Sequence, residues 1–556
     1  MLSKFKSKRI VTSCIPLMTS VVAILFHLIE TVVDDLDIMR FAESLSFNDH
    51  SEFLIIPNVL LGYLFKPFYY VLPQVNWISV LYLSLIIICF IILHTTVYDC
   101  KNYTLIASTL VFCQLIVFIY FTFTTIAFIC TFTGAIYIIQ NIENTKKKRI
   151  KRIVTGSLLI LFGFCMRSGS TLYFLLMIIL PLLMIMMLKK KHTFKVLIVI
   201  LVICISANYL TVFVNNQYVS QIPEEMYYTQ INEYRSNALD YGDIDYSKHE
   251  KQFKSAGISE NDYELFSKWV FADKDVFSVE KFSAISGIRG KNERYILNPV
   301  NLIKSILSDL RQTMFIFILL FFGFLSFLLC KNNRLEIIVT VLMSCGAVAY
   351  LHLIQRSITR VSIVVIITGI IMLCYVMSTD SDADLKRFIK KFRLPPKVII
   401  SVLCSCIILF GFVYSFDYLN EKRTSRGNLE TIISYLEEDS KITYVSDLNL
   451  RDYVELKSFS NNIFTTNWYK TNSTLLGGWD TYSFYWYANM ERLGYAECTK
   501  NAIKDVILDE HTQFITFFDP ELFVNYYKEH YNLTVKYNVV KEFDDIGLYV
   551  YDFNVV

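Results

Sequence analysis

Long apolar runs with almost no charge recur through most of this chain, and they constrain its fold more than any other feature. A helix of about 20 residues crosses the hydrocarbon core of a bilayer. A soluble protein with 54% hydrophobic residues and a mean hydropathy of +0.43 would expose too much apolar surface. The sequence therefore predicts a polytopic α-helical membrane protein with about eleven transmembrane helices, which begin near Ile10, Ile78, Tyr103, Phe121, Ile153, Ser170, Phe194, Met314, Leu335, Val361 and Val398.

Clusters of lysine and arginine between these runs predict their orientation, because short cytoplasmic loops carry an excess of basic residues. The first run follows a basic start and precedes Glu30 without a small-residue cleavage site, so we interpret it as an uncleaved signal anchor. Counting spans between the clusters places the N-terminus in the cytoplasm and the C-terminus outside the cell (plasma) membrane. The clusters lie at 146–152, 189–191, 331–334 and 386–393.

The predicted membrane domain covers residues 1–416, and it includes a first outward loop at 31–77 and a large outward loop at 215–310. The tail, 417–556, is long enough to bury a core of its own. Its patterns predict an extracytoplasmic α+β domain, with helices at 428–438, 501–509 and 520–530, strands at 442–445 and 514–518, and a closing hairpin from 533–540 and 547–553.

One apolar stretch, Phe53 to Leu72, differs from the others because it contains Pro57, Lys66 and Pro67. Counting it as a span would break the parity of the topology. We therefore expect a re-entrant or interfacial helix inside the first outward loop, with an ordinary kinked span as the alternative.

Three aspartates, Asp34, Asp35 and Asp37, stand directly after the first span, at the start of the first outward loop. Carboxylates this close to hydrocarbon are costly and often functional. At this spacing two carboxylates can share a divalent cation, or one can act as a general base while the other orients a substrate. The alternative is a solvated loop or a helix N-terminus, where acidic residues are favourable.

Basic residues fall in two turns that should face outward, against the usual bias: Arg167 in one, and Arg356 with Arg360 in the other. Residues four apart share a helix face, and two guanidiniums can grip a phosphate or pyrophosphate bidentately. His352 could contact the same phosphate, although a lone histidine in an apolar run is more often structural. Snorkelling of the arginines to lipid headgroups is the alternative interpretation.

The tail also carries an aromatic stretch from Gly477 to Tyr487 that includes Trp479. Aromatic faces stack on sugars, and Asp480 and Asn489 could bind hydroxyl groups. Core packing or contact with the membrane interface is the interpretation we favour for these aromatic residues.

Other features exclude several classes of protein. The 13 cysteines lie almost entirely within or beside apolar runs, and they form neither a disulfide framework nor a zinc-binding pattern. The formal net charge of +3 gives no reason to expect a nucleic-acid partner. The lipid bilayer is the partner that the composition does predict.

Together, the acidic motif after span one, the non-spanning segment, the many spans, the outward arginines and the outward tail resemble the GT-C superfamily of integral membrane glycosyltransferases. The chain looks most like the bacterial cell-envelope branch, which includes the YfhO-like proteins. The resemblance covers about residues 10 to 415.

This resemblance implies a polyprenyl-phosphate-linked sugar donor, an envelope glycan acceptor and an outward active site, with a separate enzyme that synthesises the donor. It makes Asp35 or Asp34 the candidate catalytic base, and Asp37 a residue that orients the acceptor or, with Asp35, holds Mg²⁺ or Mn²⁺. Arg356 and Arg360, with Arg167 and His352, would bind the lipid phosphate.

Two further classes stay open. A flippase or transporter of lipid-linked glycans would share the spans and the arginines, but it would more often place charges inside several spans. A polysaccharide polymerase or ligase would also have a long outward loop, and it would leave the first-loop aspartates without a role.

Overall fold

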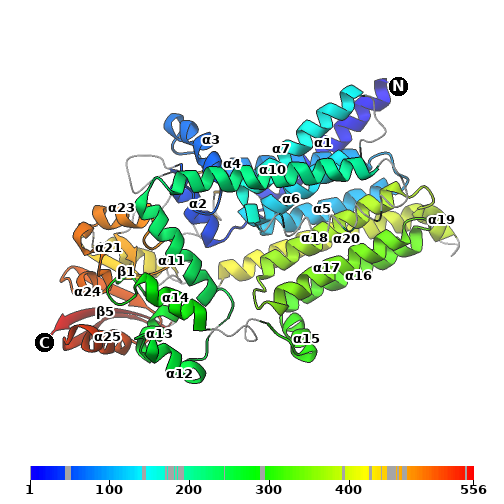
Figure 1. Cartoon of the computed structure of the whole chain (residues 1–556). Helices are drawn as coiled ribbons and strands as arrows, with labels where there is room; N and C mark the ends of the chain where they lie inside the picture. Colours follow the sequence, from blue (N-terminus) through cyan, green and yellow to red (C-terminus); the bar gives the residue numbers. More distant parts are fainter. Residues whose placement is uncertain are drawn as a thin grey trace.

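The computed structural model describes residues 2–43, 52–140, 146–169, 193–242, 244–288, 295–390, 395–424, 429–439, 441–446, 462–465, 472–544 and 547–556, with a few single residues between them. Of the described residues 71% are helical, and the C-terminal part contains a small sheet. Figure 1 shows a bundle of long helices with the N-terminus at one end. The sheet and a group of shorter helices gather at the opposite end.

Six helices of the described residues are long and apolar enough to cross a membrane, which agrees with a membrane protein. They are α4 (Trp77–Val97), α10 (Thr193–Val219), α16 (Leu310–Leu329), α17 (Arg334–Leu353), α18 (Thr359–Thr379) and α20 (Pro396–Thr424). Predicted spans also coincide with α1 (Leu2–Leu25), α5 (Tyr103–Ile119), α6 (Phe123–Ile139) and α7 (Lys146–Met166). The run predicted near Ser170 lies outside the described residues, so the total of about eleven stays a prediction.

Helix α18 occupies the centre of the bundle. Its apolar window is 89% buried, whereas the windows of α10 and α20 are 28% and 17% buried. It packs against α16, α17, α5 and α6. Large apolar side chains on α16 and α20, such as Phe317, Phe324 and Leu409, are exposed in the isolated chain. Such surfaces are expected to face lipid, because apolar groups gain nothing from contact with water.

Two helices occupy the predicted first outward loop, α2 (Val33–Glu43) and α3 (Val59–Val71). The 13 residues of α3 rise about 20 Å, short of the roughly 30 Å of a hydrocarbon core. Its side chains Tyr63, Tyr70 and Val71 are exposed. This length fits the interfacial helix that the sequence predicts; the depth of α3 in a membrane stays a prediction.

The large outward loop is helical. It contains α11 (Pro223–Leu239), α12 (Tyr246–Ser255), α13 (Glu260–Ser267), α14 (Val279–Ile288) and α15 (Pro299–Ser308). Local signals explain two of the starts: Pro223 occupies the first turn of α11, and Ser259 with Asp262 forms a capping box on α13.

The tail forms a five-stranded sheet in the order β2-β1-β3-β5-β4. Strand β1 pairs in parallel with β2 and β3, while β5 is antiparallel to both β3 and β4. The strands are β1 (Thr443–Ser446), β2 (Ser473–Leu475), β3 (Thr512–Thr516), β4 (Val535–Phe543) and β5 (Leu548–Val555). The helices are α21 (Leu429–Glu438), α23 (Phe484–Arg492), α24 (Ala502–Ile507) and α25 (Glu521–Tyr531), with a 3-10 turn at Ala496–Thr499.

The large outward loop and the tail share one hydrophobic core, although the sequence analysis placed the loop in the membrane domain and the tail in a domain of its own. Buried residues of 231–288 and 445–553 belong to a single cluster. At its centre the backbone N–H groups of Phe271 and Ala272 both donate to the carbonyl of Leu476, at 2.9 Å each. The approach is so close that a Cβ on Gly477 would lie 1.3 Å from the Trp269 carbonyl oxygen.

We therefore predict that Gly477→Ala separates these two segments. The added methyl group cannot be accommodated without moving backbone, so we expect a loss of roughly 2 kcal/mol or more of stability. Limited proteolysis and thermal unfolding of the detergent-solubilised chain would measure it. Gly287→Ala is the matched control, because a Cβ there meets nothing within 4 Å. Equal stability of the two variants would contradict the prediction.

Candidate functional site

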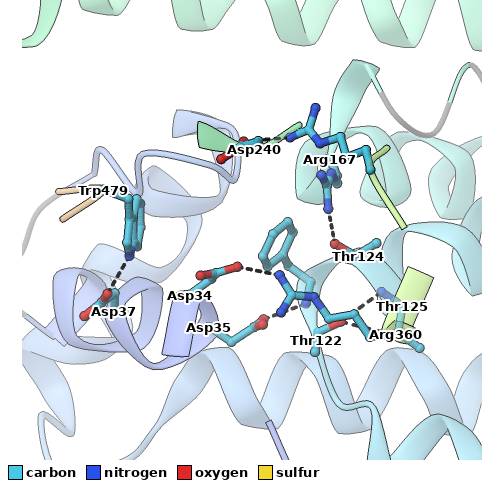
Figure 2. Close-up of polar contacts among 12 residues, drawn as sticks. Asp34, Asp35, Asp37, Thr122, Thr124, Thr125, Arg167, Asp240, Arg360 and Trp479 are labelled. Atoms are coloured by element: carbon cyan, nitrogen blue, oxygen red, sulfur yellow. Dashed lines mark hydrogen bonds and ion pairs between the residues drawn. The ribbon is translucent and has the colours of Figure 1, made fainter. Parts of the chain in front are cut away.

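The three aspartates lie on helix α2, with Asp34 and Asp35 in its first turn. Asp35 and Asp37 are two residues apart, and on a helix such residues do not face each other. Figure 2 shows the result: Asp34 and Asp35 point toward Arg360, whereas Asp37 points toward Trp479. The helix thus divides the predicted acidic cluster between two environments.

Asp35 is completely buried. Its Oδ1 accepts hydrogen bonds from the backbone N–H of Phe123 at 2.6 Å and from the Tyr82 hydroxyl at 3.2 Å. Its Oδ2 is buried without a hydrogen-bond partner among the described residues. Burial raises the pKa of Asp35 well above its ordinary value, and the charge of Asp34 adds to this, while Phe123 N–H, Arg360 and Tyr82 oppose it.

Asp34 is more accessible, and it forms an ion pair with Arg360. Its Oδ2 lies 2.7 Å from Arg360 Nη2, with about a third of the Asp34 side chain exposed. Arg360 lies in the first turn of α18, whose N-cap residue Ile358 provides no side-chain cap. The positive end of this central helix therefore adds to the charge of Arg360.

The other two predicted arginines lie on the same side of the site. Arg356 binds Asp240 Oδ2 at 3.1 Å and the Tyr241 hydroxyl at 3.2 Å, which links the membrane helices to the end of α11. Arg167 donates to the Thr124 hydroxyl and lies 5.3 Å from the centre of the Phe123 ring. Burial and then the charges of Arg360 and Arg356 lower the pKa of Arg167 to about 10, so it stays protonated at neutral pH.

A cavity of about 450 Å³ opens beside these arginines. Arg167, Arg356 and Thr124 form its polar wall, and apolar side chains of α6, α17 and α18, such as Phe128, Leu351 and Val365, form the rest. A second hollow of about 480 Å³ lies on the other side of Ile358 and includes Arg360. Positive charge in the wall of a largely apolar cavity suits an amphiphile with an anionic head.

Asp37 is a buried anchor for the tail. Its Oδ2 accepts a hydrogen bond from Trp479 Nε1 at 2.9 Å, and its Oδ1 lies 3.3 Å from Arg40 Nη1. Beside this contact the rings of Phe41 and Tyr485 stack with their centroids 3.9 Å apart. Trp479, which the sequence singled out for sugar stacking or core packing, is thus buried against α2.

His352 does not join the arginines. It is 2% exposed, and both ring nitrogens have partners: the Ser305 hydroxyl at 2.9 Å and the Gln312 side-chain amide at 2.8 Å. These bonds connect α15, α16 and α17, which is a structural role.

The pair predicted to hold a divalent cation does not fit one shared ion, because Asp35 and Asp37 lie on different sides of α2. Among the described residues, one group of three or more side chains could hold a metal ion, and it lies between α13 and α25: Asp262, Glu529 and His530. There His530 Nε2 lies 2.6 Å from Asp262 Oδ1.

Sequence reasoning missed the partners of the charged residues. Asp240 was one polar residue among many in a long loop, and nothing local indicates that it meets Arg356, 116 residues away. The Phe123 N–H and the Tyr82 hydroxyl that hold Asp35 also come from distant helices. No sequence signal short of three-dimensional contacts could have found them.

No protein-family model matches this sequence, and no curated protein matches it either.

The two buried aspartates should respond differently to substitution. In Asp35→Asn the amide oxygen can keep both hydrogen bonds, and the amide nitrogen takes the place of the unpartnered Oδ2, so we expect unchanged or higher thermal stability. Asp37→Ala leaves the Trp479 N–H buried without its acceptor, which costs about 1–3 kcal/mol. Thermal unfolding of the purified variants checks both, and a greater loss for Asp35→Asn would contradict the assignment.

Proposed function

We propose that this chain is a membrane glycosyltransferase. It moves a sugar from a polyprenyl-phosphate donor to a cell-envelope glycan on the extracytoplasmic face of the cell membrane, with a GT-C-like arrangement of about eleven spans. The N-terminus then lies in the cytoplasm, and the tail lies outside with the large outward loop.

One observation carries the proposal: a buried carboxylate with an unpartnered oxygen, Asp35, interacts with Arg360 and Arg167, and Arg167 and Arg356 line an apolar cavity. A base and an anion-binding group next to each other are what transfer from a lipid phosphate needs. The cavity wall formed by α6, α17 and α18 suits the first isoprene units of such a lipid.

The donor phosphate binds by replacing the carboxylates that hold two of the arginines. Arg360 and Arg356 are held by Asp34 and Asp240, whose side chains are 33% and 26% exposed. Partly exposed ion pairs are weak, so a phosphate that offers several oxygens can replace the carboxylates. The bound phosphate also offsets the positive charge of Arg360, which lowers the pKa of Asp35, so Asp35 becomes a stronger base.

The reaction is a single displacement. Asp35 takes the proton of the acceptor hydroxyl, and the hydroxyl oxygen forms a bond to the anomeric carbon. The bond from that carbon to the phosphate oxygen breaks, and the electron pair leaves with the lipid phosphate, which Arg356, Arg360 and Arg167 stabilise. Inversion at the sugar is expected. No step is assigned to a divalent cation.

Asp35→Asn and Arg356→Ala should each abolish sugar transfer without preventing membrane insertion. Loss of a general base costs about 10²–10⁴-fold in rate. The measurement is the sugar content of envelope polymers in cells with the wild type, each variant, or no protein. Asp99→Asn is the control, since this carboxylate is 74% exposed and pairs with Lys8 away from the site. Wild-type sugar content with Asp35→Asn would contradict the proposal.

The flippase alternative makes a different prediction for the same measurement. If the deletion loses a sugar substituent while the variant with Asp34, Asp35 and Asp37 all changed to Asn keeps it, the carboxylates carry no chemistry. A flippase or a polymerase would then account for the arginines and the cavity.

Transfer should also depend on pH in one direction. The base acts deprotonated, so activity is present above the folded pKa of Asp35 and is lost as pH falls through it. Because burial raises that pKa, the loss should occur well above the pH near 4 that is usual for an aspartate. The check is a rate profile in proteoliposomes with the donor that the cellular experiment identifies. A rate that is flat down to about pH 4 would exclude Asp35 as the base.

A further inference from the structure

A larger cleft, of about 970 Å³, lies away from the arginines, where three outward elements meet. Its walls come from α3 and the segment before it, from the start of α11, and from α23 of the tail. Aromatic side chains line it together with carboxylates and two lysines, among them Tyr227, Phe484, Tyr487, Glu224 and Lys274. The mechanism proposed above uses none of these residues.

The cleft contains a buried carboxylate without a full set of partners. Glu225 is 1% exposed, and its Oε1 accepts the backbone N–H of Phe484 at 2.9 Å. Its Oε2 has no hydrogen-bond partner among the described residues. Burial raises the pKa of Glu225 to about 7. A buried acceptor of this kind is costly unless a ligand or water satisfies it.

The same cleft offers donors beside aromatic faces. Lys274 Nζ donates to the Tyr487 hydroxyl at 2.7 Å, and it lies 4.6 Å from the centre of the Tyr227 ring. An ammonium has three donors, and among the described residues the Tyr487 hydroxyl is its one hydrogen-bond acceptor. Phe484 is 48% exposed, so part of its ring is open to a ligand.

We infer that this cleft binds a carbohydrate chain. The lining carries both signs of charge, so neither a purely cationic nor a purely anionic ligand matches all of it; the charged residues are Glu52, Glu224, Glu225, Glu491, Lys66 and Lys274. A sugar ring fits both, because each hydroxyl donates and accepts while the C–H face stacks on an aromatic ring. That the bound chain is the acceptor of transfer rests on the proposed function; the binding itself does not.

The cleft is connected to α2 through the tail. Within α23 and the residues before it, Phe484 and Tyr487 face the cleft, whereas Tyr485 stacks on Phe41 of α2 and Trp479 binds Asp37. A chain held in the cleft therefore lies on the element that also positions the helix of Asp35.

The test is direct binding of neutral hexasaccharides to the full chain in detergent, by saturation-transfer NMR and titration calorimetry. The probes are chitohexaose, cellohexaose and maltohexaose. We expect at least one to bind, with Glu225→Gln and Phe484→Ala each weakening the affinity about tenfold, which corresponds to about 1.4 kcal/mol. Both variants should fold, since one conserves size and the other removes an exposed ring.

Two controls isolate the cleft. Phe517→Ala removes a ring of the tail that is 38% exposed and does not line the cleft, and Asp35→Asn removes the proposed base; both should bind like the wild type. In Asp35→Asn, loss of transfer tests the proposed function, whereas unchanged sugar binding tests this inference. Either one can therefore fail without the other. The inference is overturned if no hexasaccharide binds, if both cleft variants bind normally, or if tetramethylammonium binds in the cleft instead.

Discussion

The arrangement of this protein depends on the cost of burying the carboxylates of α2. A buried charge is tolerated only where hydrogen bonds or opposite charges compensate it. Asp35 obtains them from the membrane helices, through the Phe123 N–H and Tyr82, and Asp37 obtains them from Trp479 of the tail. Because the two residues face opposite ways, one short helix connects the bundle to the outward domain.

The same principle explains why Arg356 and Arg360 form ion pairs with carboxylates. Three guanidiniums beside one another repel, and after burial the charges of Arg360 and Arg356 are the next cause of the lowered pKa of Arg167. Asp34 and Asp240 offset this repulsion while leaving the pairs partly exposed. Such pairs contribute little to stability, but they keep Arg356 and Arg360 oriented. Under the proposed function, a site built in this way is preorganised for the donor phosphate, and its reorganisation on binding is limited to two side-chain exchanges.

Sequence patterns predicted what depends on local periodicity. The apolar runs coincide with helices wherever the structure describes them, and the tail has the predicted strands and helices except β2 and α23, which were missed. Asp34 and Asp35 lie in the first turn of α2, which agrees with the helix N-terminus given as the alternative, but no sequence pattern reveals the distant partners of Asp35. The link from Asp37 to Trp479 spans 442 residues, and the core shared by the large outward loop and the tail is equally non-local. The sequence indicated only that Asp34 and Arg360 lie on the same side of the membrane, because counting the spans places both of their turns outward.

Helix α11 relates the two candidate sites. Glu225 lies in its first turn and faces the cleft, and Asp240 caps its last turn and holds Arg356. Fifteen residues separate them, or about 22 Å of helix. A group bound at Glu225 is therefore remote from Asp240 and Arg356, and it contributes binding energy away from that arginine. Under the proposed function, the cleft selects which chain is presented, while Asp35 of α2 and Arg360 of α18 act on its end.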